Sequence, residues 1–472
     1  MKLVQTKVFR FLGSIQLAAP LLLILAGLLA TGTIVESLYS TAVAKRFVYS
    51  TWWFCGFLLL LGTNVFCSAL SRFPWKKHQT GFVITHLGIL FILAGSLVTQ
   101  QAGVDGQIAL KEGETGSVFL EEKPTLYYSY GMGFTGQIPA SYPLLAPNPD
   151  RPFVMKLPEG GYLMVDQFYL NAHSRTLARA VEEKEKGYPS VHLDLQSSFV
   201  QENQWLFLGH AQYGNLNLGP AGAYFEKEGD WVKRAARDKS IPPNALAILL
   251  APNGSLKYQV RAHGNYSPVQ ELRLGDSYPT GWMDMQFKVM ESMPHAAPEQ
   301  DFVSEPLPRQ KDPEPAVHFQ VHQGEEEYQG WLGYQNQVAF PWKGKKFQLA
   351  YAPRQGFLPF KIRLQKFTVG FDPGTEKAAS YASDVFTEQP SEGAEAPAHI
   401  CMNQPLHLKG YTVYQAGYQA LPEGGYMSIF SVGKDPGIGL KYGGALVMVM
   451  GLIFMFWFKN PAWNKRDSDG TN

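Results

Sequence analysis

Apolar residues in this chain are concentrated near its two ends, and a long stretch of mixed polar and apolar residues lies between them. Four apolar runs each have close to the ~20 residues that an α-helix needs to cross the hydrocarbon core of a bilayer. They extend from about Gly13 to Thr31, Thr51 to Leu70, Thr80 to Val98 and Ile438 to Phe458. We therefore predict four transmembrane helices, three of them near the N-terminus and one near the C-terminus.

The first run has a second interpretation, as a signal peptide, because Ala42-Val43-Ala44 resembles a small-residue cleavage site. That triplet lies far beyond the apolar run, whereas signal peptidase cuts close to it. We expect the first run to remain in the protein as a membrane helix.

Residues 100–437 show the alternation of apolar and polar positions that is typical of half-buried β-strands. The clearest examples are SVHLDLQSS, MQFKVMES, AVHFQVHQ, FKIRLQKFTVGF and LKGYTVYQAGY. The segment ALAILLAPNGSLKYQV predicts a hairpin with Asn253-Gly254 at its turn. We expect one short helix near residues 175–187, and exposed loops at 291–315 and 372–397, where proline, small and charged residues are frequent.

The predicted fold is an integral membrane protein with four transmembrane α-helices and a large external, mainly β domain that resembles a sandwich. Its parts are residues 1–99 with three transmembrane helices and short loops, residues 100–437 as the external β-rich domain, and residues 438–472 as the fourth helix and a short tail.

Lysine and arginine beside the apolar runs predict the orientation, because cytoplasmic loops carry an excess of these residues. The N-terminal tail, the loop between the second and third runs, and the C-terminal tail share one side of the membrane and are rich in cations: Lys2, Lys7, Arg10, Arg72, Lys76, Lys77, Lys459, Lys465 and Arg466. Lys45 and Arg46 lie on the opposite side and argue weakly against this orientation. We predict a multi-pass protein of the cell inner (cytoplasmic) membrane with both termini in the cytoplasm and residues 100–437 on the periplasmic, extracytoplasmic side.

The net charge of +1 gives no electrostatic bias toward nucleic acid, and we expect no nucleic-acid partner. Cys55 and Cys67 lie on one predicted helix, about 18 Å apart along its axis, whereas a disulfide requires Cα atoms within about 7 Å. Cys401 is the one external cysteine. We therefore expect no internal disulfide.

Motifs for catalysis or covalent haem attachment are absent from the sequence: it contains no CxxCH, HExxH, P-loop or GxSxG. His318 and His322 have the four-residue spacing of metal ligands on a helix, but the surrounding alternation predicts a strand. On a strand these side chains would share one face about 13 Å apart, too far to share a metal ion. We interpret them as surface histidines and predict no catalytic residue.

The third apolar run, GFVITHLGILFILAG, contains one ionisable residue, His86. Gly81, Gly88 and Gly95 lie on one face of the predicted helix, and small residues on one face allow membrane helices to approach closely. We expect that face to pack against another membrane helix of the same chain. His86 lies roughly 160° away and about 9 Å from the cytoplasmic end of the helix. Its neighbours form an apolar stripe: Phe82, Leu90, Leu93 and Leu97.

A histidine at this depth has two interpretations. Apolar surroundings favour the neutral imidazole, which keeps a lone pair for an iron ion, and a flat apolar macrocycle would cover the stripe. Alternatively, His86 forms a hydrogen bond to a neighbouring helix. The residue types alone leave both interpretations open.

Several segments along the chain are similar to those of a known family: THLGILFILAGSL followed by GVDGQIALKEGE, then SDVFTEQ, MNQPLHLKGYTVYQAGYQ, and DPGIGLKYGGALVMVMGL at the last apolar run. In the order and placement of these segments, the chain resembles the ResB family of cytochrome c biogenesis, in the system II pathway. The family has the same plan of three N-terminal membrane helices, a large external β-rich domain and a final helix. One departure is the segment 32–50, which is shorter here than in many relatives.

The resemblance implies a subunit of a membrane cytochrome c synthase, which helps to carry haem across the membrane and presents it with apocytochrome c for covalent attachment at CxxCH. ResB-type proteins pair with a CcsA/ResC-type membrane protein, receive apocytochrome c as client and depend on thioredoxin-like reductants. In the family a histidine of the third membrane helix is implicated as an axial ligand of haem, and the matching residue here is His86. We therefore expect transient, non-covalent binding of haem b, with His86 as the candidate ligand of the haem iron.

The same resemblance implies an accessory subunit of a cytochrome c haem lyase complex rather than an enzyme that acts alone. A competing hypothesis is a membrane-anchored sensor or scaffold whose external β domain binds a ligand. That hypothesis predicts a cytoplasmic output module, for which the tail after Phe458 is short. A transporter is a third possibility, although four helices with one large external insertion are a poor plan for transport.

Overall fold

The structure is a computed structural model that describes residues 6–131, 134–139, 147–157, 160–199, 201–238, 240–342, 344–374, 378–389 and 395–459. Backbone contacts divide the chain into two compact units. Unit 1 comprises residues 1–146, 308–313 and 334–472, and unit 2 comprises residues 147–307 and 314–333. The three parts predicted from the sequence follow the membrane boundaries instead, and that division stays a prediction.

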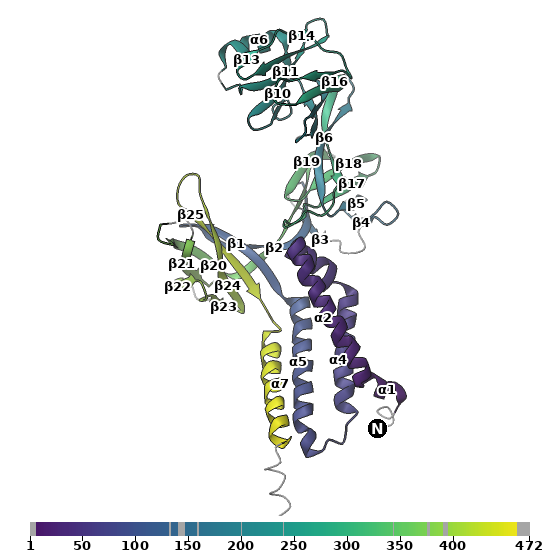
Figure 1. Cartoon of the computed structure of the whole chain (residues 1–472), viewed down its shortest axis with the longest axis vertical. Coiled ribbons are helices and arrows are strands. Elements are labelled where there is room, and N and C mark those ends of the chain that lie inside the picture. The colour runs from purple at the N-terminus through teal and green to yellow at the C-terminus, as the bar shows by residue number, and fades with distance from the viewer. Residues whose placement is uncertain are drawn as a thin grey trace, which may run out of the picture. The chain divides into compact units, whose positions relative to one another are not determined.

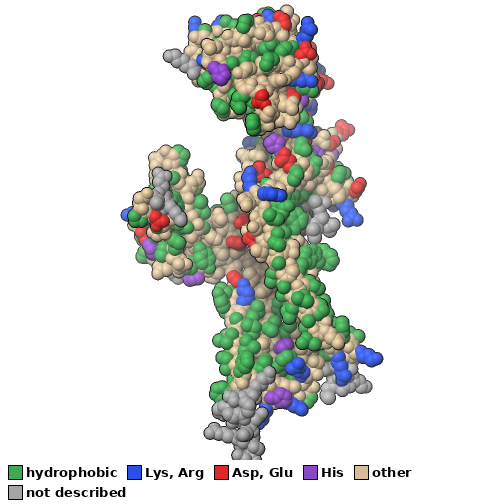
Figure 2. All heavy atoms as spheres, in the orientation of Figure 1, with side chains coloured by type: hydrophobic (Ala, Val, Ile, Leu, Met, Phe, Trp, Pro, Cys, Tyr) green, Lys and Arg blue, Asp and Glu red, His purple; other side chains and the backbone are tan. Residues whose placement is uncertain are grey.

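Four helices of unit 1 are long and apolar enough to cross a membrane, as the sequence predicts. They are α2 (Ile15–Leu38), α4 (Trp52–Leu70), α5 (Thr80–Ala102) and α7 (Ile438–Lys459). Shorter helical segments lie beside them: α1 (Lys7–Leu12), α3 (Thr41–Ala44), a π-helical turn (Lys45–Tyr49) and a 3-10 turn (Lys77–Gln79). Hydrophobic side chains cover the helical part, and lysine and arginine side chains gather at its lower end in Figure 2.

The strands of unit 1 form one ten-stranded sheet with the order β22-β21-β20-β2-β1-β25-β24-β23, in which β19 also pairs with β20 and β3 with β2. All of these pairs are antiparallel. The strands are β1 (Val104–Lys111), β2 (Thr115–Tyr130), β3 (Phe134–Pro139), β19 (Asn336–Trp342), β20 (Lys345–Phe371), β21 (Ala378–Glu388), β22 (Glu395–Cys401), β23 (Leu406–Leu408), β24 (Tyr411–Ala420) and β25 (Tyr426–Lys434).

This sheet curls so that β22 returns beside β24, and one face of it packs on itself. Side chains from seven strands meet in the enclosed core, among them Ile108, Phe119, Ile362, Val413 and Phe430. Alternation along each strand places these apolar residues on the inner face, because successive side chains of a strand point to opposite sides.

Two membrane helices continue directly into neighbouring strands of the sheet (Figure 1). Helix α5 ends at Ala102 and β1 begins at Val104, while β25 ends at Lys434 and α7 begins at Ile438. Strands β1 and β25 pair over their full lengths, from Val104 opposite Lys434 to Lys111 opposite Met427. The paired strands therefore continue into a pair of antiparallel helices, which ties the sheet to the membrane segment.

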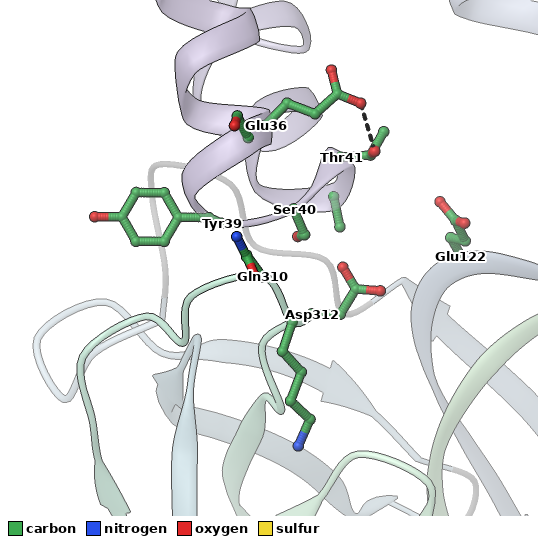
Figure 3. Close-up of a pocket in the computed structure, with 10 residues that line it drawn as sticks. Glu36, Tyr39, Ser40, Thr41, Glu122, Gln310 and Asp312 are labelled. Carbon is green, nitrogen blue, oxygen red and sulfur yellow. Dashed lines mark hydrogen bonds between the residues drawn. The ribbon is translucent and has the colours of Figure 1, made fainter.

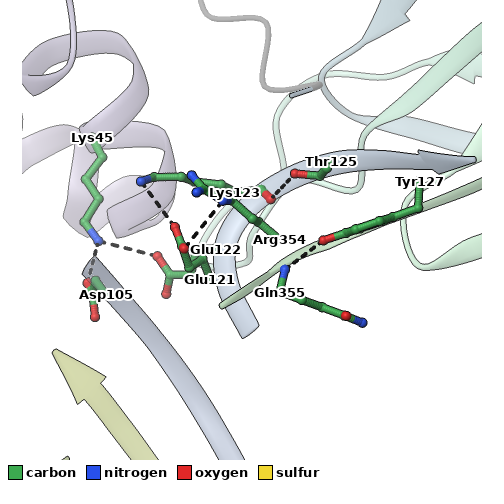
Figure 4. A network of polar contacts seen from close by, with 9 residues as sticks. All are labelled: Lys45, Asp105, Glu121, Glu122, Lys123, Thr125, Tyr127, Arg354 and Gln355. Atoms are coloured by element: carbon green, nitrogen blue, oxygen red, sulfur yellow. Dashed lines mark hydrogen bonds and ion pairs between the residues drawn. The ribbon is translucent and has the colours of Figure 1, made fainter. Parts of the chain in front are cut away.

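Ionic contacts add to this connection between the π-helical turn and the sheet (Figure 4). The Lys45 ammonium lies 3.5 Å from a carboxylate oxygen of Asp105 and 3.4 Å from one of Glu122. These pairs are largely exposed and contribute little free energy. They match the charge of Lys45 with carboxylates of the sheet.

The strands of unit 2 form three sheets with the orders β13-β12-β11-β10-β9, β15-β16-β7-β8 and β18-β17-β5-β4; β14 also pairs with β12, and β6 with β16. The strands are β4 (Phe153–Lys156), β5 (Tyr162–Tyr169), β6 (Ala172–Ala180), β7 (Tyr188–Gln196), β8 (Gln201–Phe207), β9 (Asn215–Asn217), β10 (Ala221–Lys227), β11 (Asn244–Leu250), β12 (Leu256–Ala262), β13 (Asn265–Tyr266), β14 (Gln270–Glu271), β15 (Ser277–Pro279), β16 (Gln286–Ser304), β17 (Ala316–Gln323) and β18 (Glu326–Gly333).

Two of these sheets face one another across a hydrophobic core, which confirms the expected sandwich-like arrangement within unit 2. Leu193 of β7 and Phe287 of β16 pack in the same core as Phe225 of β10 and Ile248 of β11. The hairpin predicted at Asn253-Gly254 is confirmed, since β11 and β12 pair antiparallel across that turn.

One helix of unit 2, α6 (Glu228–Arg237), was not predicted from the sequence. It connects β10 to β11, which are parallel, and parallel neighbours need a long crossover connection. Trp231 of α6 is fully buried against β11. Acidic residues in the first turn and arginines in the last turn, which favour the helix dipole, were the available signal.

Three local predictions were wrong because strand pairing outweighs composition. The first half of the helix expected near 175–187 is part of strand β6, which pairs with β16 from Ala172 opposite Ser304 to Ala180 opposite Ala296, and the second half is a turn. The loop expected at 291–315 contains most of β16, and the one expected at 372–397 contains β21 and the start of β22. Proline and charged residues are tolerated there because these strands keep an exposed face.

Candidate functional site

Helices α5 and α7 pack along the three glycines of α5 that the sequence singled out. A Cβ atom added at Gly88 would lie 2.5 Å from the Met448 amide nitrogen and 2.6 Å from the Gly444 carbonyl oxygen. In the same way, a Cβ atom added at Gly81 would overlap the Gly451 carbonyl oxygen, and one added at Gly95 would overlap the Gly437 carbonyl oxygen. The expected packing of this face against another helix of the same chain is confirmed.

The glycines of α7 that complete this seam were missed, although they recur every seven residues at 437, 444 and 451. Their period matches that of the α5 glycines, so each glycine of one helix faces a glycine of the other in antiparallel order. Two matching seven-residue glycine repeats were the signal in the sequence.

At the end of this seam nearest the sheet, Asp435 joins α5 to α7. The Thr99 hydroxyl donates to Asp435 Oδ1 at 2.6 Å, the Gly437 amide donates to the same atom at 3.0 Å, and the Lys441 ammonium lies 2.5 Å from Oδ2. Desolvation alone would raise the pKa of the Asp435 carboxyl, but hydrogen bonds from Lys441 and Thr99 outweigh it, and the pKa is lowered from 3.8.

We expect this junction to weaken in acid. The pKa of Asp435 is lower in the folded protein than the unfolded value of 3.8. Its contribution to the free energy of unfolding is therefore present above pH 3.8 and is lost as the pH falls through the folded-state pKa. Thermal unfolding of the solubilised protein, followed from about pH 6 downward, measures this effect. At the highest pH tested, the wild type is expected to be more stable than Asp435→Asn. In acid the two proteins should become equally stable. A stability difference that stays constant with pH would contradict a charged Asp435 at this junction.

His86 lies in α5 on the stripe opposite the glycine seam, and its side chain is half-buried. Its Nδ1 lies 2.9 Å from the Phe82 carbonyl oxygen, one turn earlier in the helix. A carbonyl oxygen only accepts, so Nδ1 carries the proton and donates. The lone pair is then on Nε2, which has no hydrogen-bond partner among the residues that the structure describes.

The two interpretations of His86 from the sequence are thus partly resolved. The hydrogen bond runs to the carbonyl of its own helix rather than to a neighbouring helix. Helix α4 passes beside the stripe further along, where Leu93 Cδ1 would lie 3.5 Å from a Cβ atom on Gly62. Part of the stripe is therefore covered by this chain, and His86 lies beyond that contact, toward the end of α5 that carries the α4–α5 loop.

The residues around His86 fit a haem iron better than a bare metal ion. In the described part of the chain, no three His, Cys, Asp or Glu side chains are grouped as metal ligands. A haem iron is already held by four porphyrin nitrogens, so one imidazole suffices on one side of the ring. The Nδ1–H···O=C bond fixes the tautomer and orients the ring, as carbonyl partners do for histidines that ligate metals.

The other histidines and cysteines that the sequence raised do not form a second site. His318 and His322 lie on strand β17 as predicted, but they are half-buried rather than on the surface. His318 Nδ1 lies 2.6 Å from Asp166 Oδ1, and His322 stacks on Tyr162 at 4.7 Å between ring centres. All three cysteines are free, which confirms that the chain forms no internal disulfide.

A cavity of about 490 Å³ lies beside the C-terminal end of α2 in unit 1 (Figure 3). Its lining includes the carboxylates of Glu36, Glu122 and Asp312, and the Thr41 hydroxyl donates to Glu36 at 2.7 Å. Among the described residues, no histidine or cysteine lines this cavity.

Comparison with known proteins finds a family match that includes strands of the unit 1 sheet. Residues 327–427 match the ResB-like family. Protein NrfI of Wolinella succinogenes is 31% identical over 106 residues, which make up 22% of this chain and 11% of that protein. The chain therefore covers about a tenth of the length of NrfI. The matches confirm the resemblance to ResB and support a role in cytochrome c biogenesis.

The family match covers β19 to β24 together with most of β18 and the first residues of β25. It includes part of the core of the unit 1 sheet, such as Phe360, Ile362 and Val413. Helix α5 lies outside the matched residues. The role of His86 is accordingly a proposal that depends on the geometry of the helix.

Proposed function

We propose that this chain is the ResB-type subunit of a membrane cytochrome c synthase. In this proposal it helps to carry haem b across the inner membrane and presents it with apocytochrome c for attachment at CxxCH. A CcsA/ResC-type membrane protein is the partner, and His86 is the ligand that this chain offers to the haem iron.

The observation that carries the proposal is the state of the His86 imidazole. One nitrogen is held by the carbonyl of Phe82, and the other, within a membrane helix, has no hydrogen-bond partner in the described part of the chain. An unsatisfied polar atom at this depth is costly unless something uses it. An iron ion coordinated at Nε2 would remove that cost.

The contacts of α5 with α7 and with the sheet give this ligand a fixed position. The glycine seam leaves no gap between α5 and α7, and Asp435 joins the external ends of both helices. Since α5 continues into β1 and α7 follows β25, the helix that carries His86 is joined directly to the sheet. In the proposal, the sheet provides the surface on which apocytochrome c is received.

The chain needs partners for the remaining chemistry. When bound, haem supplies the vinyl groups to which cysteine thiols add, and that reaction requires reduced thiols and ferrous iron. The three cysteines of this chain are free and unpaired with one another. Thioredoxin-like proteins are therefore proposed to reduce the client thiols, and the chain acts by holding and orienting haem.

We expect His86→Ala to remove most of the haem from the purified complex, because the substitution deletes the proposed iron ligand. The complex of this chain with its membrane partner is purified from wild type and variant in parallel. The visible spectrum and the pyridine haemochrome content are then compared at equal protein concentration.

His78→Ala is the matched control, since His78 lies in the exposed 3-10 turn before α5. It is expected to keep wild-type haem content. Equal haem in the His86→Ala and wild-type complexes, with both subunits present in equal amounts, would contradict the role of His86.

A further inference from the structure

The loop that follows α4 forms a defined turn that places Arg72 beside α5. The Phe73 amide donates to the Leu70 carbonyl at 3.0 Å, and the Trp75 indole donates to the Ala69 carbonyl at 2.9 Å. Both bonds satisfy carbonyls at the end of α4 that have no partner within the helix. The backbone around Arg72 is therefore fixed by the end of α4.

The Arg72 side chain extends from this turn over an aromatic ring of α5. Its guanidinium carbon lies 3.8 Å from the centre of the Phe82 ring. The Phe82 ring in turn lies 3.8 Å from the His86 imidazole, centre to centre. A cation–π contact at this distance holds the guanidinium near the imidazole but leaves its N–H donors available.

Arg72 has no anionic partner in this part of the protein. Residues 1–35, 52–102 and 436–466 contain no aspartate or glutamate. The charged residues of α4, α5, α7 and the α4–α5 loop are therefore all basic, and the one acid of the membrane helices is Glu36, near the other end of α2. Among the described residues, no carboxylate lies within ion-pair distance of Arg72. A carboxylate of a bound molecule is therefore a suitable partner for this guanidinium.

Haem b carries two propionate carboxylates at one edge of its macrocycle. The Arg72 guanidinium and the His86 imidazole both contact the Phe82 ring, each at 3.8 Å from its centre. A haem held at His86 would therefore have Arg72 near one edge of its ring. Arginine binds carboxylates through two parallel hydrogen bonds, and such a pair fixes orientation as well as position.

We propose that Arg72 is a positioning residue that binds a haem propionate while His86 holds the iron. The inference rests on the proposed function, because it requires haem at His86. It assigns the propionate edge of the bound haem to the end of α5 that carries the α4–α5 loop, and the opposite edge to the interior of the membrane.

The test compares haem b with haem dimethyl ester, in which both propionates are esterified and uncharged. The complete complex is depleted of haem and titrated with each compound, and binding is followed by the Soret band. For wild type we expect haem b to bind about tenfold more tightly than the diester, a typical effect of one charge-assisted hydrogen-bonded pair.

Three variants complete the comparison. Arg72→Gln is expected to bind both compounds with similar affinity, at the level of wild type with the diester, and to keep the Soret position that reports ligation at His86. Arg72→Lys, which keeps the charge but not the two-pronged geometry, is expected to retain part of the preference. Arg10→Gln removes one cation from α1 and is expected to bind like wild type.

An unchanged preference for haem b in Arg72→Gln would overturn the inference and assign the guanidinium to another anion, such as a lipid phosphate. Loss of the preference in Arg10→Gln as well would overturn it in favour of a general charge effect. Failure of the proposed function is a separate result, since it appears as unchanged haem content in His86→Ala.

Discussion

Replacing Gly88 by leucine is expected to separate α5 from α7 and to remove the fixed position of His86. A Cβ atom at this residue would lie 2.5 Å from the backbone nitrogen of Met448, closer than real Cβ atoms approach. Backbone atoms cannot rotate away as a flexible side chain can. We expect a cost at the upper end of the overpacking range, about 3 kcal/mol or more.

Thermal unfolding of the solubilised wild type and variant measures this result. Gly439→Leu is the matched control, because it lies on α7 with no atom within 4 Å of the added Cβ. Equal stability of the two variants would contradict the packing described for the seam.

The membrane part of the fold was predictable because the bilayer imposes a simple rule on length and polarity. The four helices follow from apolar runs, and the packing face of α5 follows from three glycines seven residues apart. The same rule identified His86, since an ionisable residue inside an apolar helix has few structural reasons to be there.

The external part was harder to predict because strand positions depend on partners that are distant in the chain. Strands β6 and β16 are more than one hundred residues apart, and each is stabilised by the other rather than by its own composition. The division into two units also escaped prediction, since residues 308–313 return to unit 1 from within the sequence of unit 2.

The surroundings of His86 could be only partly predicted. The stripe on α5 followed from helical periodicity, but the contact of Arg72 with Phe82 depends on the turn after α4. Periodicity within one helix does not report on the side chains that a neighbouring loop brings to it. Lysine and arginine in that loop were therefore assigned to orientation alone.

Substitutions at Phe119 and Gly356 are expected to show how the ResB-like segment completes the external sheet. Gly356 lies within the matched segment, on β20, and Phe119 lies on β2, outside it. The two residues are opposite one another in the sheet, and a Cβ atom on Gly356 would lie 2.2 Å from Phe119 Cζ. The glycine leaves room for the phenyl ring, which is 2% exposed.

Phe119→Ala is expected to destabilise the protein by about 3–5 kcal/mol, because it leaves a cavity in the core. Gly356→Val should also destabilise, since the added methyl groups overlap the ring, whereas Gly433→Val on β25 has no atom within 4 Å of its Cβ and serves as the control. In the double variant the valine occupies space that the ring vacates, so the combined loss should be smaller than the sum of the two. Denaturant unfolding of the four proteins measures the coupling. Additive losses would show that the ring and the glycine do not share one space, and the family segment would then fold without support from β2.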